Sequence, residues 1–262
     1  MIKMKKYIGT ISAIILSIVA SNNLHAQLKV ISYNDESQKL NGVSAVPTKA
    51  LKNKPGVLIL PAWMGITEHP KGVAEKLSSM GYHVFVADIY GDGNIPKDTK
   101  QASEQAGIYK SDVNKYRRRI KLALEQLVKS GADANQLVVI GYCFGGQGAL
   151  EAARANFPVK GVVSFHGGLS RDAKQEISPI NPKVLILHGA DDPFIPEADV
   201  KGIQDEMKKA KADWQMTFYA NAVHSFTELA AGNDNSKGAA YNEKADKRSW
   251  QAALDFFDEI FK

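Results

Sequence analysis

From about residue 56 onward, short apolar runs alternate with amphipathic segments. The apolar runs are continuous, which is typical of strands buried on both faces. They are Gly56–Trp63, His83–Gly91, Gln136–Tyr142, Val159–Gly167, Lys183–Gly189 and Trp214–Ala220. Segments of helical periodicity lie at Lys71–Tyr82, Val113–Val128, Gly145–Ala155, Ala198–Ala210 and Lys247–Phe261. This alternation predicts an α/β fold, in which a mostly parallel central sheet is covered by helices on both faces.

Two regions fit this pattern less well. Alternation is weak at Lys29–Tyr33 and Gly42–Val46, where we expect two opening strands with an antiparallel start. We predict neither a helix nor a strand in the polar stretch from Gly91 to about Lys110.

The first residues follow a different pattern. Lys3, Lys5 and Lys6 precede an apolar segment from Tyr7 to Ala20, and Ala26 is a small residue at a plausible cleavage position. This order of charge, apolar run and small residue predicts a secretory signal peptide at residues 1–26. The alternative is an uncleaved anchor. We therefore expect one domain at residues 27–262, exported to the periplasm or secreted, with no stable membrane span after signal cleavage.

Charge changes little in this picture. The formal charge is +5, and removal of residues 1–26 lowers it to +2, so no nucleic-acid partner is expected. Lys115 and Arg117–Arg119 form a basic cluster that we expect on the solvated face of a helix. The predicted buried stripe of that helix is Tyr116, Ile120, Leu124 and Leu127.

The only cysteine of the chain stands where a strand passes into a helix. The residues around Cys143 read G-Y-C-F-G, a nucleophile-elbow pattern with cysteine in place of serine. Gly141 and Gly145 would give the crowded turn its room, and the helix N-terminus favours a thiolate. The main-chain N–H of Phe144 would then point at an oxyanion. The alternative is a buried thiol with no chemistry.

Two later strand ends supply a carboxylate and a histidine. Asp191 and Asp192 follow the strand at Lys183–Gly189, and His224 follows the strand at Trp214–Ala220. Each has an ordinary explanation as turn chemistry or a surface residue. Together with Cys143 they give the order nucleophile, acid, histidine of the α/β-hydrolases. The spacing with His188 matches no metal template, so neither a metal site nor a cofactor is expected.

Further candidates lie at other strand ends. Trp63 follows an early strand and is the expected second backbone N–H donor of an oxyanion hole. Ala62, Tyr90 and His166 are candidate substrate-binding residues.

These motifs resemble the dienelactone hydrolase family of α/β-hydrolases. The resemblance rests on "GYCFGG", "DDPFIP" and "HSF" in that order, and it covers the chain after residue 26. It implies a Cys143–His224–Asp192 triad, because the family's aspartate immediately precedes the x-F-I-P segment. It also implies that Trp63 and Phe144 form the oxyanion hole.

The chain departs from the family pattern at three positions. Ala62 stands where the resemblance implies a glutamate that helps activate the thiol, so we expect His224 to activate Cys143 directly. Asp92 and Glu228 stand where it implies two arginines that hold a substrate carboxylate. These two acids argue against dienelactone itself and favour an uncharged ester or lactone.

The sequence thus predicts a hydrolase that cleaves a small carboxylic ester or lactone through a thioester intermediate on Cys143. A non-catalytic small-molecule binding protein on a hydrolase scaffold is the alternative. A thiol redox protein would lack a second cysteine to resolve an internal disulfide. We expect a monomer with a small-molecule substrate.

Overall fold

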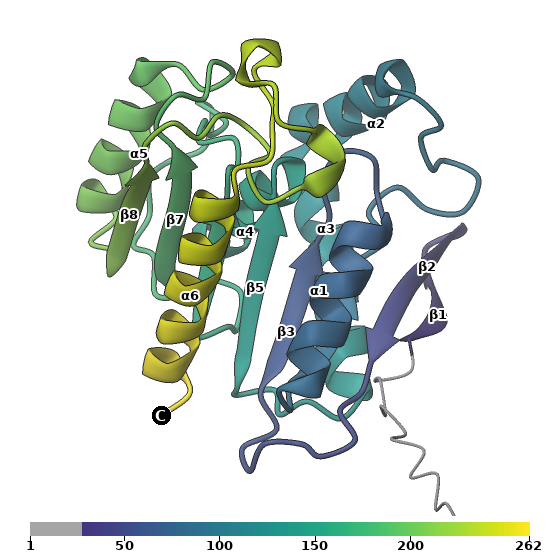
Figure 1. Ribbon diagram of the computed structural model, residues 1–262. Coiled ribbons are helices and arrows are strands. Elements are labelled where there is room, and N and C mark those ends of the chain that lie inside the picture. The colour runs from purple at the N-terminus through teal and green to yellow at the C-terminus, as the bar shows by residue number, and fades with distance from the viewer. Residues whose placement is uncertain (1–27) are drawn as a thin grey trace, which may run out of the picture.

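The computed structural model describes residues 28–262 as one eight-stranded sheet with helices on both faces (Figure 1). The strands are β1 (Leu28–Asp35), β2 (Gln38–Ala45), β3 (Gly56–Leu60), β4 (His83–Val86), β5 (Leu137–Tyr142), β6 (Gly161–Phe165), β7 (Lys183–Gly189) and β8 (Trp214–Tyr219). Their order in the sheet is β1-β2-β4-β3-β5-β6-β7-β8. The predicted signal peptide at residues 1–26 lies outside the described residues.

The antiparallel start of the sheet is confirmed. The hairpin β1–β2 is antiparallel, and β2 also pairs antiparallel with β4. Every pair from β4 to β8 is parallel, as the buried apolar runs predict. The carboxyl ends of these parallel strands therefore meet at one edge of the sheet, where chemistry collects in open α/β folds.

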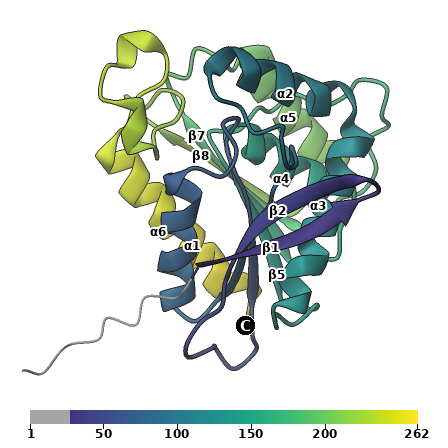
Figure 2. The ribbon, with the colours of Figure 1, turned by 90° about the vertical axis from the view of Figure 1, so that its right-hand side faces the viewer.

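Two helix layers cover the sheet (Figure 2). On one face lie α1 (Glu68–Ser79) and α6 (Glu243–Ile260); on the other lie α3 (Val113–Lys129), α4 (Phe144–Arg154) and α5 (Glu197–Lys209). Two short 3₁₀ turns, at Leu229–Ala231 and Asn235–Lys237, precede α6. None of the helices within residues 28–262 is both long and apolar enough to cross a membrane.

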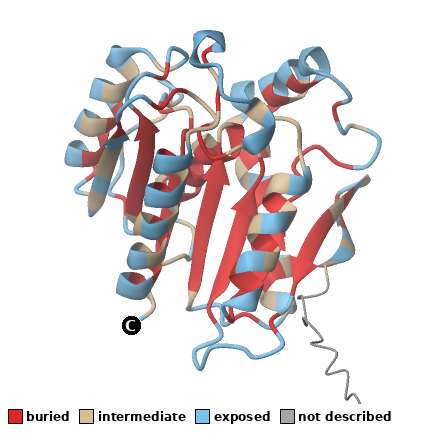
Figure 3. Cartoon of the chain, viewed as in Figure 1, coloured by how far each residue is buried: buried red, intermediate tan, exposed pale blue. Residues whose placement is uncertain are grey.

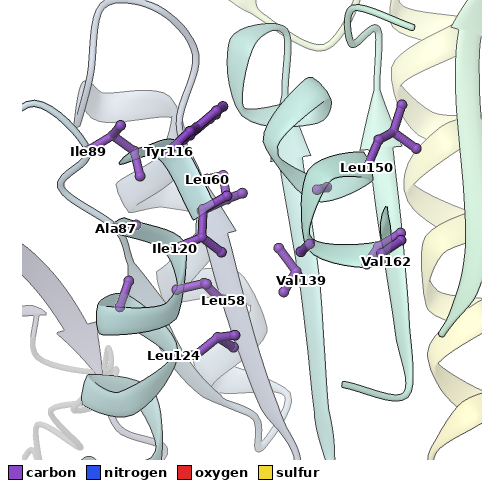
Figure 4. Packing of buried hydrophobic residues seen from close by; sticks show 14 of the residues in the cluster. Leu58, Leu60, Ala87, Ile89, Tyr116, Ile120, Leu124, Val139, Leu150 and Val162 are labelled. Carbon is purple, nitrogen blue, oxygen red and sulfur yellow. The ribbon is translucent and has the colours of Figure 1, made fainter. Parts of the chain in front are cut away.

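The central strands bury side chains on both faces (Figure 3). Leu58 and Val139 point toward Ile120 of α3, in the cluster drawn in Figure 4. Val57 and Ile140 point the other way, into the cluster shared with α1 and α6. Because each strand has a two-residue side-chain period, a continuous apolar run feeds both layers at once.

The structure contains a helix that the sequence prediction missed. The polar stretch after Gly91 includes α2 (Thr99–Ser111), which begins with the Asp98 side chain accepting a hydrogen bond from the N–H of Gln101. Its buried face consists of Ala102, Ala106 and Tyr109. Two of these residues are only methyl-sized, so the helix carries little apolar signal in the sequence.

The prediction for the basic cluster is wrong at Arg119. The stripe of α3 is buried as expected, but Arg119 is also only 4% exposed, and its Nε lies 2.9 Å from Asp35 Oδ2 of β1. Arg117 forms an ion pair of 2.6 Å with the buried Glu151 of α4. A buried carboxylate needs such a partner, and helix periodicity alone does not reveal partners on other elements.

Candidate active site

Cys143 occupies the sharp turn between β5 and α4. Its φ of +53° is a strained conformation for a residue with a side chain, and its N–H donates to the Phe165 carbonyl at 3.0 Å. The thiol is partly exposed at the carboxyl edge of the sheet. The predicted elbow geometry at this position is confirmed.

Glycines make this turn possible. A Cβ on Gly141 would lie 1.9 Å from the Gly145 carbonyl oxygen, and a Cβ on Gly145 would lie 2.0 Å from the Leu60 carbonyl oxygen. No side chain fits at such distances. The predicted need for small residues at both positions is therefore confirmed.

Aromatic side chains pack against Phe144, the residue that follows Cys143 at the start of α4. The Phe144 ring stacks on Tyr116 with centroids 4.6 Å apart, and the Tyr116 hydroxyl donates to the Phe144 carbonyl at 3.0 Å. The ring of Tyr90 stacks on Phe144 from another side at 5.8 Å. This packing fixes the first turn of α4 and the direction of its N–H groups.

Asp192 and His224 form a close pair. Asp192 Oδ2 accepts a hydrogen bond from His224 Nδ1 at 2.7 Å, and its other oxygen accepts from the Phe194 N–H at 2.9 Å. The Asp192 side chain is fully buried, whereas Asp191 is exposed. Of the two candidate aspartates, only Asp192 has this hydrogen bond.

The imidazole of His224 is held between two rings. His166 packs on it at 5.4 Å and Phe194 at 5.5 Å. Burial alone would lower the pKa of His224, but its contacts with Asp192 and Cys143 outweigh burial and raise the pKa to about 10. The imidazole is therefore held as a cation while it faces the thiol. The sequence pattern does not predict this contact of Phe194 with the imidazole.

His166 lies behind the site rather than in it. It is fully buried, and its Nε2 shares a hydrogen bond of 2.8 Å with the Thr227 hydroxyl. Burial, together with the nearby charge of His224, holds the pKa of His166 well below its usual range. It therefore stays neutral, and it lines neither of the two cavities described below.

The loop after β3 carries the second expected N–H donor. β3 and β4 end earlier than predicted, so Trp63 and Tyr90 lie in loops. The buried Tyr90 hydroxyl donates to the Trp63 carbonyl at 2.9 Å. Among the backbone hydrogen bonds of residues 28–262, neither the Trp63 N–H nor the Phe144 N–H has a carbonyl acceptor.

Two cavities flank this loop. The larger one, of about 790 Å³, lies between α1 and α6, and its lining includes Trp63, Tyr142 and Ser225. The smaller one, of about 180 Å³, includes Tyr90 and Phe144 in its lining. Ala62 borders both cavities. Of the three candidate pocket residues, Ala62 and Tyr90 line a cavity and His166 does not.

The two acids that replace the expected arginines differ. Asp92 is exposed, lies 3.7 Å from Lys39 and lines neither cavity. Glu228 lines the larger cavity, and burial raises the pKa of its carboxyl.

The candidate metal ligands do not converge. His188 is buried against Phe218, and Asp191 is exposed. Across residues 28–262, no group of three or more His, Cys, Asp or Glu side chains is arranged to hold a metal ion.

Comparisons with known proteins identify the family of the chain. The model of the dienelactone hydrolase family matches residues 40–261. A provisionally named carboxymethylenebutenolidase of Salmonella typhimurium is 24% identical over 78% of this chain and 76% of its own length. An uncharacterised Caenorhabditis elegans protein is 31% identical over 58% of this chain and 98% of its own length.

A solved structure extends the match to three dimensions. The crystal structure of a dienelactone hydrolase-like promiscuous phosphotriesterase from metagenomic libraries is 34% identical. It covers 91% of this chain and all of its own length, with a TM-score of 0.85. The chain therefore belongs to the dienelactone hydrolase family: it has the α/β-hydrolase fold and is a carboxylic ester hydrolase of that family.

Proposed function

We propose that the protein hydrolyses an uncharged carboxylic ester or lactone through a Cys143–His224–Asp192 triad. The observation that carries the proposal is the position of Cys143 on a strained elbow, facing an imidazole that is hydrogen-bonded to a fully buried carboxylate. Nucleophile, base and orienting acid are the three roles that acyl transfer requires.

His224 activates the thiol directly. Its pKa of about 10 means that the imidazole holds a proton at neutral pH, and Cys143 is one of the groups that stabilise this cation. The nucleophile is the Cys143 thiolate, with the imidazolium beside it as the opposite charge. No further acid is needed near the thiol, which agrees with Ala62 at the position where the family carries a glutamate.

The first half-reaction transfers the acyl group to sulfur. The Cys143 thiolate attacks the carbonyl carbon, and the N–H groups of Trp63 and Phe144 stabilise the resulting oxyanion. Tyr90 holds the Trp63 peptide in place through its hydrogen bond. The carbon–oxygen ester bond then breaks, and His224 donates its proton to the leaving alkoxide, which leaves a thioester on Cys143.

The second half-reaction begins with the Cys143 sulfur uncharged, because the first half-reaction has converted the thiolate into a thioester. The thioester has no negative sulfur, so the pKa of His224 falls once its cation loses that partner. The neutral imidazole accepts a proton from water, and the hydroxide attacks the thioester. Collapse of this intermediate releases the carboxylic acid and restores the thiolate.

The charges at the site favour an uncharged substrate. The charged residues that line the larger cavity are three acids and two lysines, with no arginine among them: Glu68, Lys76, Glu228, Asp246 and Lys247. Of the two lysines, Lys76 lies over the Trp250 ring and Lys247 is paired with Glu243. A substrate carboxylate would find no guanidinium to pair with and would lose its hydration.

We further propose that residues 1–26 are removed on export and that the enzyme acts in the periplasm or outside the cell. The support is the charge and hydropathy pattern of the first residues. N-terminal sequencing of the protein from fractionated cells tests this. A chain that keeps Met1 and stays in the cytoplasm contradicts it.

The function is tested by trapping the intermediate. Wild type and Cys143→Ala are assayed with p-nitrophenyl acetate, small lactones and a phosphotriester, and rapidly quenched samples are analysed by mass spectrometry. We expect turnover and an acyl adduct on the Cys143 peptide in wild type, with both absent in Cys143→Ala. Full activity of Cys143→Ala contradicts the mechanism, and no turnover of any substrate by wild type favours the binding-protein alternative.

A further inference from the structure

The larger cavity lies beside the triad: its lining includes Tyr142 and Ser225, the chain neighbours of Cys143 and His224, but neither Cys143 nor His224 itself. One end is lined by Trp63, whose N–H belongs to the proposed oxyanion hole, and the other end is lined by Lys76 and Trp250. Its walls are α1 and α6, and β3 and β5 are visible between these two helices in Figure 1. From Glu68 to Lys76 the α1 wall extends for about 12 Å. We call this cavity the α1–α6 groove.

The floor of the groove is apolar. Tyr142 and Phe165, the last residues of β5 and β6, form the floor and stack on each other at 4.7 Å. Trp250 of α6 and Val73 of α1 line the sides. Binding of a hydrocarbon group to such a surface is favourable, by about 25 cal/mol for each Å² of apolar area removed from water.

The polar side chains along the groove favour an uncharged ligand over a charged one. Burial lowers the pKa of His69 to about 4, so this residue is neutral at physiological pH. Lys76 lies 3.9 Å from the centre of the Trp250 ring and bridges α1 to α6 at the far end. Burial raises the pKa of both Glu228 and Asp246, and the same loss of solvent would penalise a carboxylate of the ligand placed beside them.

The volume of the groove exceeds the needs of a minimal substrate. Sites of about 300–1,000 Å³ hold drug-sized ligands, and the groove measures about 790 Å³. An acetyl group or a five-membered lactone would leave most of it filled with water. A ligand that continues away from the reacting carbonyl would displace this water from apolar walls.

We propose that the α1–α6 groove binds an extended, uncharged apolar arm of the ester, while the ester carbonyl lies at Cys143. The arm is either the acyl chain or the alcohol chain, since both leave the same carbonyl. This inference rests on the proposed function and names the substrate class for that site: esters with a hydrocarbon arm rather than compact, carboxylate-bearing lactones.

Gly72 offers a way to block the groove without disturbing the helix. It lies in α1 on the lining of the groove, and a Cβ added there would meet no atom within 4 Å. Gly202 of α5 is equally exposed and equally open, but it lies on the other face of the sheet. Gly72→Phe and Gly202→Phe are therefore a matched pair of helix substitutions.

The first measurement compares short and long substrates. kcat/KM is determined for p-nitrophenyl acetate and octanoate, and for ethyl and octyl acetate, with wild type and both variants. We expect wild type to favour the long member of one series, and Gly72→Phe to lower that preference at least about tenfold, mainly through KM. Gly202→Phe should keep the wild-type preference. An unchanged preference in Gly72→Phe overturns the proposal.

The second measurement does not depend on turnover. Two of the three tryptophans, Trp63 and Trp250, line the groove, so their fluorescence reports its occupancy. Titration with N-octylacetamide, an uncharged amide, should give saturable binding to wild type and Gly202→Phe, and at least about tenfold weaker binding to Gly72→Phe. Equal binding to all three proteins rejects the groove. Binding without hydrolysis of any ester rejects the proposed function and keeps the groove.

Discussion

At Gly141 a methyl group would lie 1.9 Å from the carbonyl oxygen of Gly145, whereas at Gly72 it would meet no atom within 4 Å. Both glycines border the same strand-end region, one at the elbow and one in the α1–α6 groove. At the elbow the absence of a side chain lets two backbone segments touch. In the groove it leaves open space above an apolar floor.

The two regions therefore do different work. The elbow is close-packed, with aromatic rings and backbone hydrogen bonds fixing the thiol and its N–H donors. Such packing holds reacting groups in place and tolerates almost no change of volume. The groove has room, which is a property suited to choosing among substrates. Substitutions at the elbow should thus abolish function or folding, and those in the groove should change selectivity.

The largest effect is expected at the acid of the triad. Asp192→Asn keeps the shape of the side chain but removes the charge that orients and stabilises the His224 cation. We expect kcat/KM for p-nitrophenyl acetate to fall about 10³- to 10⁴-fold. The neighbouring Asp191→Asn, on an exposed side chain, should stay within about twofold of wild type. Equal losses in both variants would assign the effect to the loop rather than to the acid.

The next largest effect is on folding. Gly141→Ala places a methyl group against the backbone of Gly145, so either β5 or α4 must move. We expect the free energy of unfolding to fall by about 3 kcal/mol or more, measured by urea denaturation. A loss below about 1 kcal/mol would show that the elbow is softer than its packing indicates.

The pH dependence of acylation should follow His224. Its proton, which protonates the leaving alkoxide, is present below the pKa of about 10 and is lost as the pH rises through that value. We expect kcat/KM for an alkyl ester to fall about tenfold per pH unit above 10, and less for a p-nitrophenyl ester, whose leaving group needs no proton. A fall that begins near pH 6.5 instead would mean that His224 has an ordinary pKa.

The difference between the elbow and the groove also explains which features of the site the sequence could predict. The elbow is a local feature: a strand, a nucleophile, flanking glycines and a helix all occur within about fifteen residues, so Cys143, Gly141 and Gly145 were predictable. Asp192 and His224 were found because parallel strands bring their ends to one edge.

No short stretch of the sequence predicts the α1–α6 groove. Its walls come from α1 and α6, far apart in the chain, and Gly72 looks like any helical glycine. For the same reason the burial of Arg119 was missed, because its partner Asp35 lies on β1. Features that depend on contacts between distant elements require the structure.

The smallest predicted effect is at Gly72 itself. Since the position is helical and nothing lies near its Cβ, Gly72→Ala should add helix propensity and reduce the freedom of the unfolded chain. We expect the free energy of unfolding to rise by about 0.5–1 kcal/mol in urea denaturation, opposite in sign to Gly141→Ala. A destabilisation instead would mean that the groove is closed over Gly72 in solution. The space between α1 and α6 would then be too small for a substrate arm, and the comparison with the elbow would lose its basis.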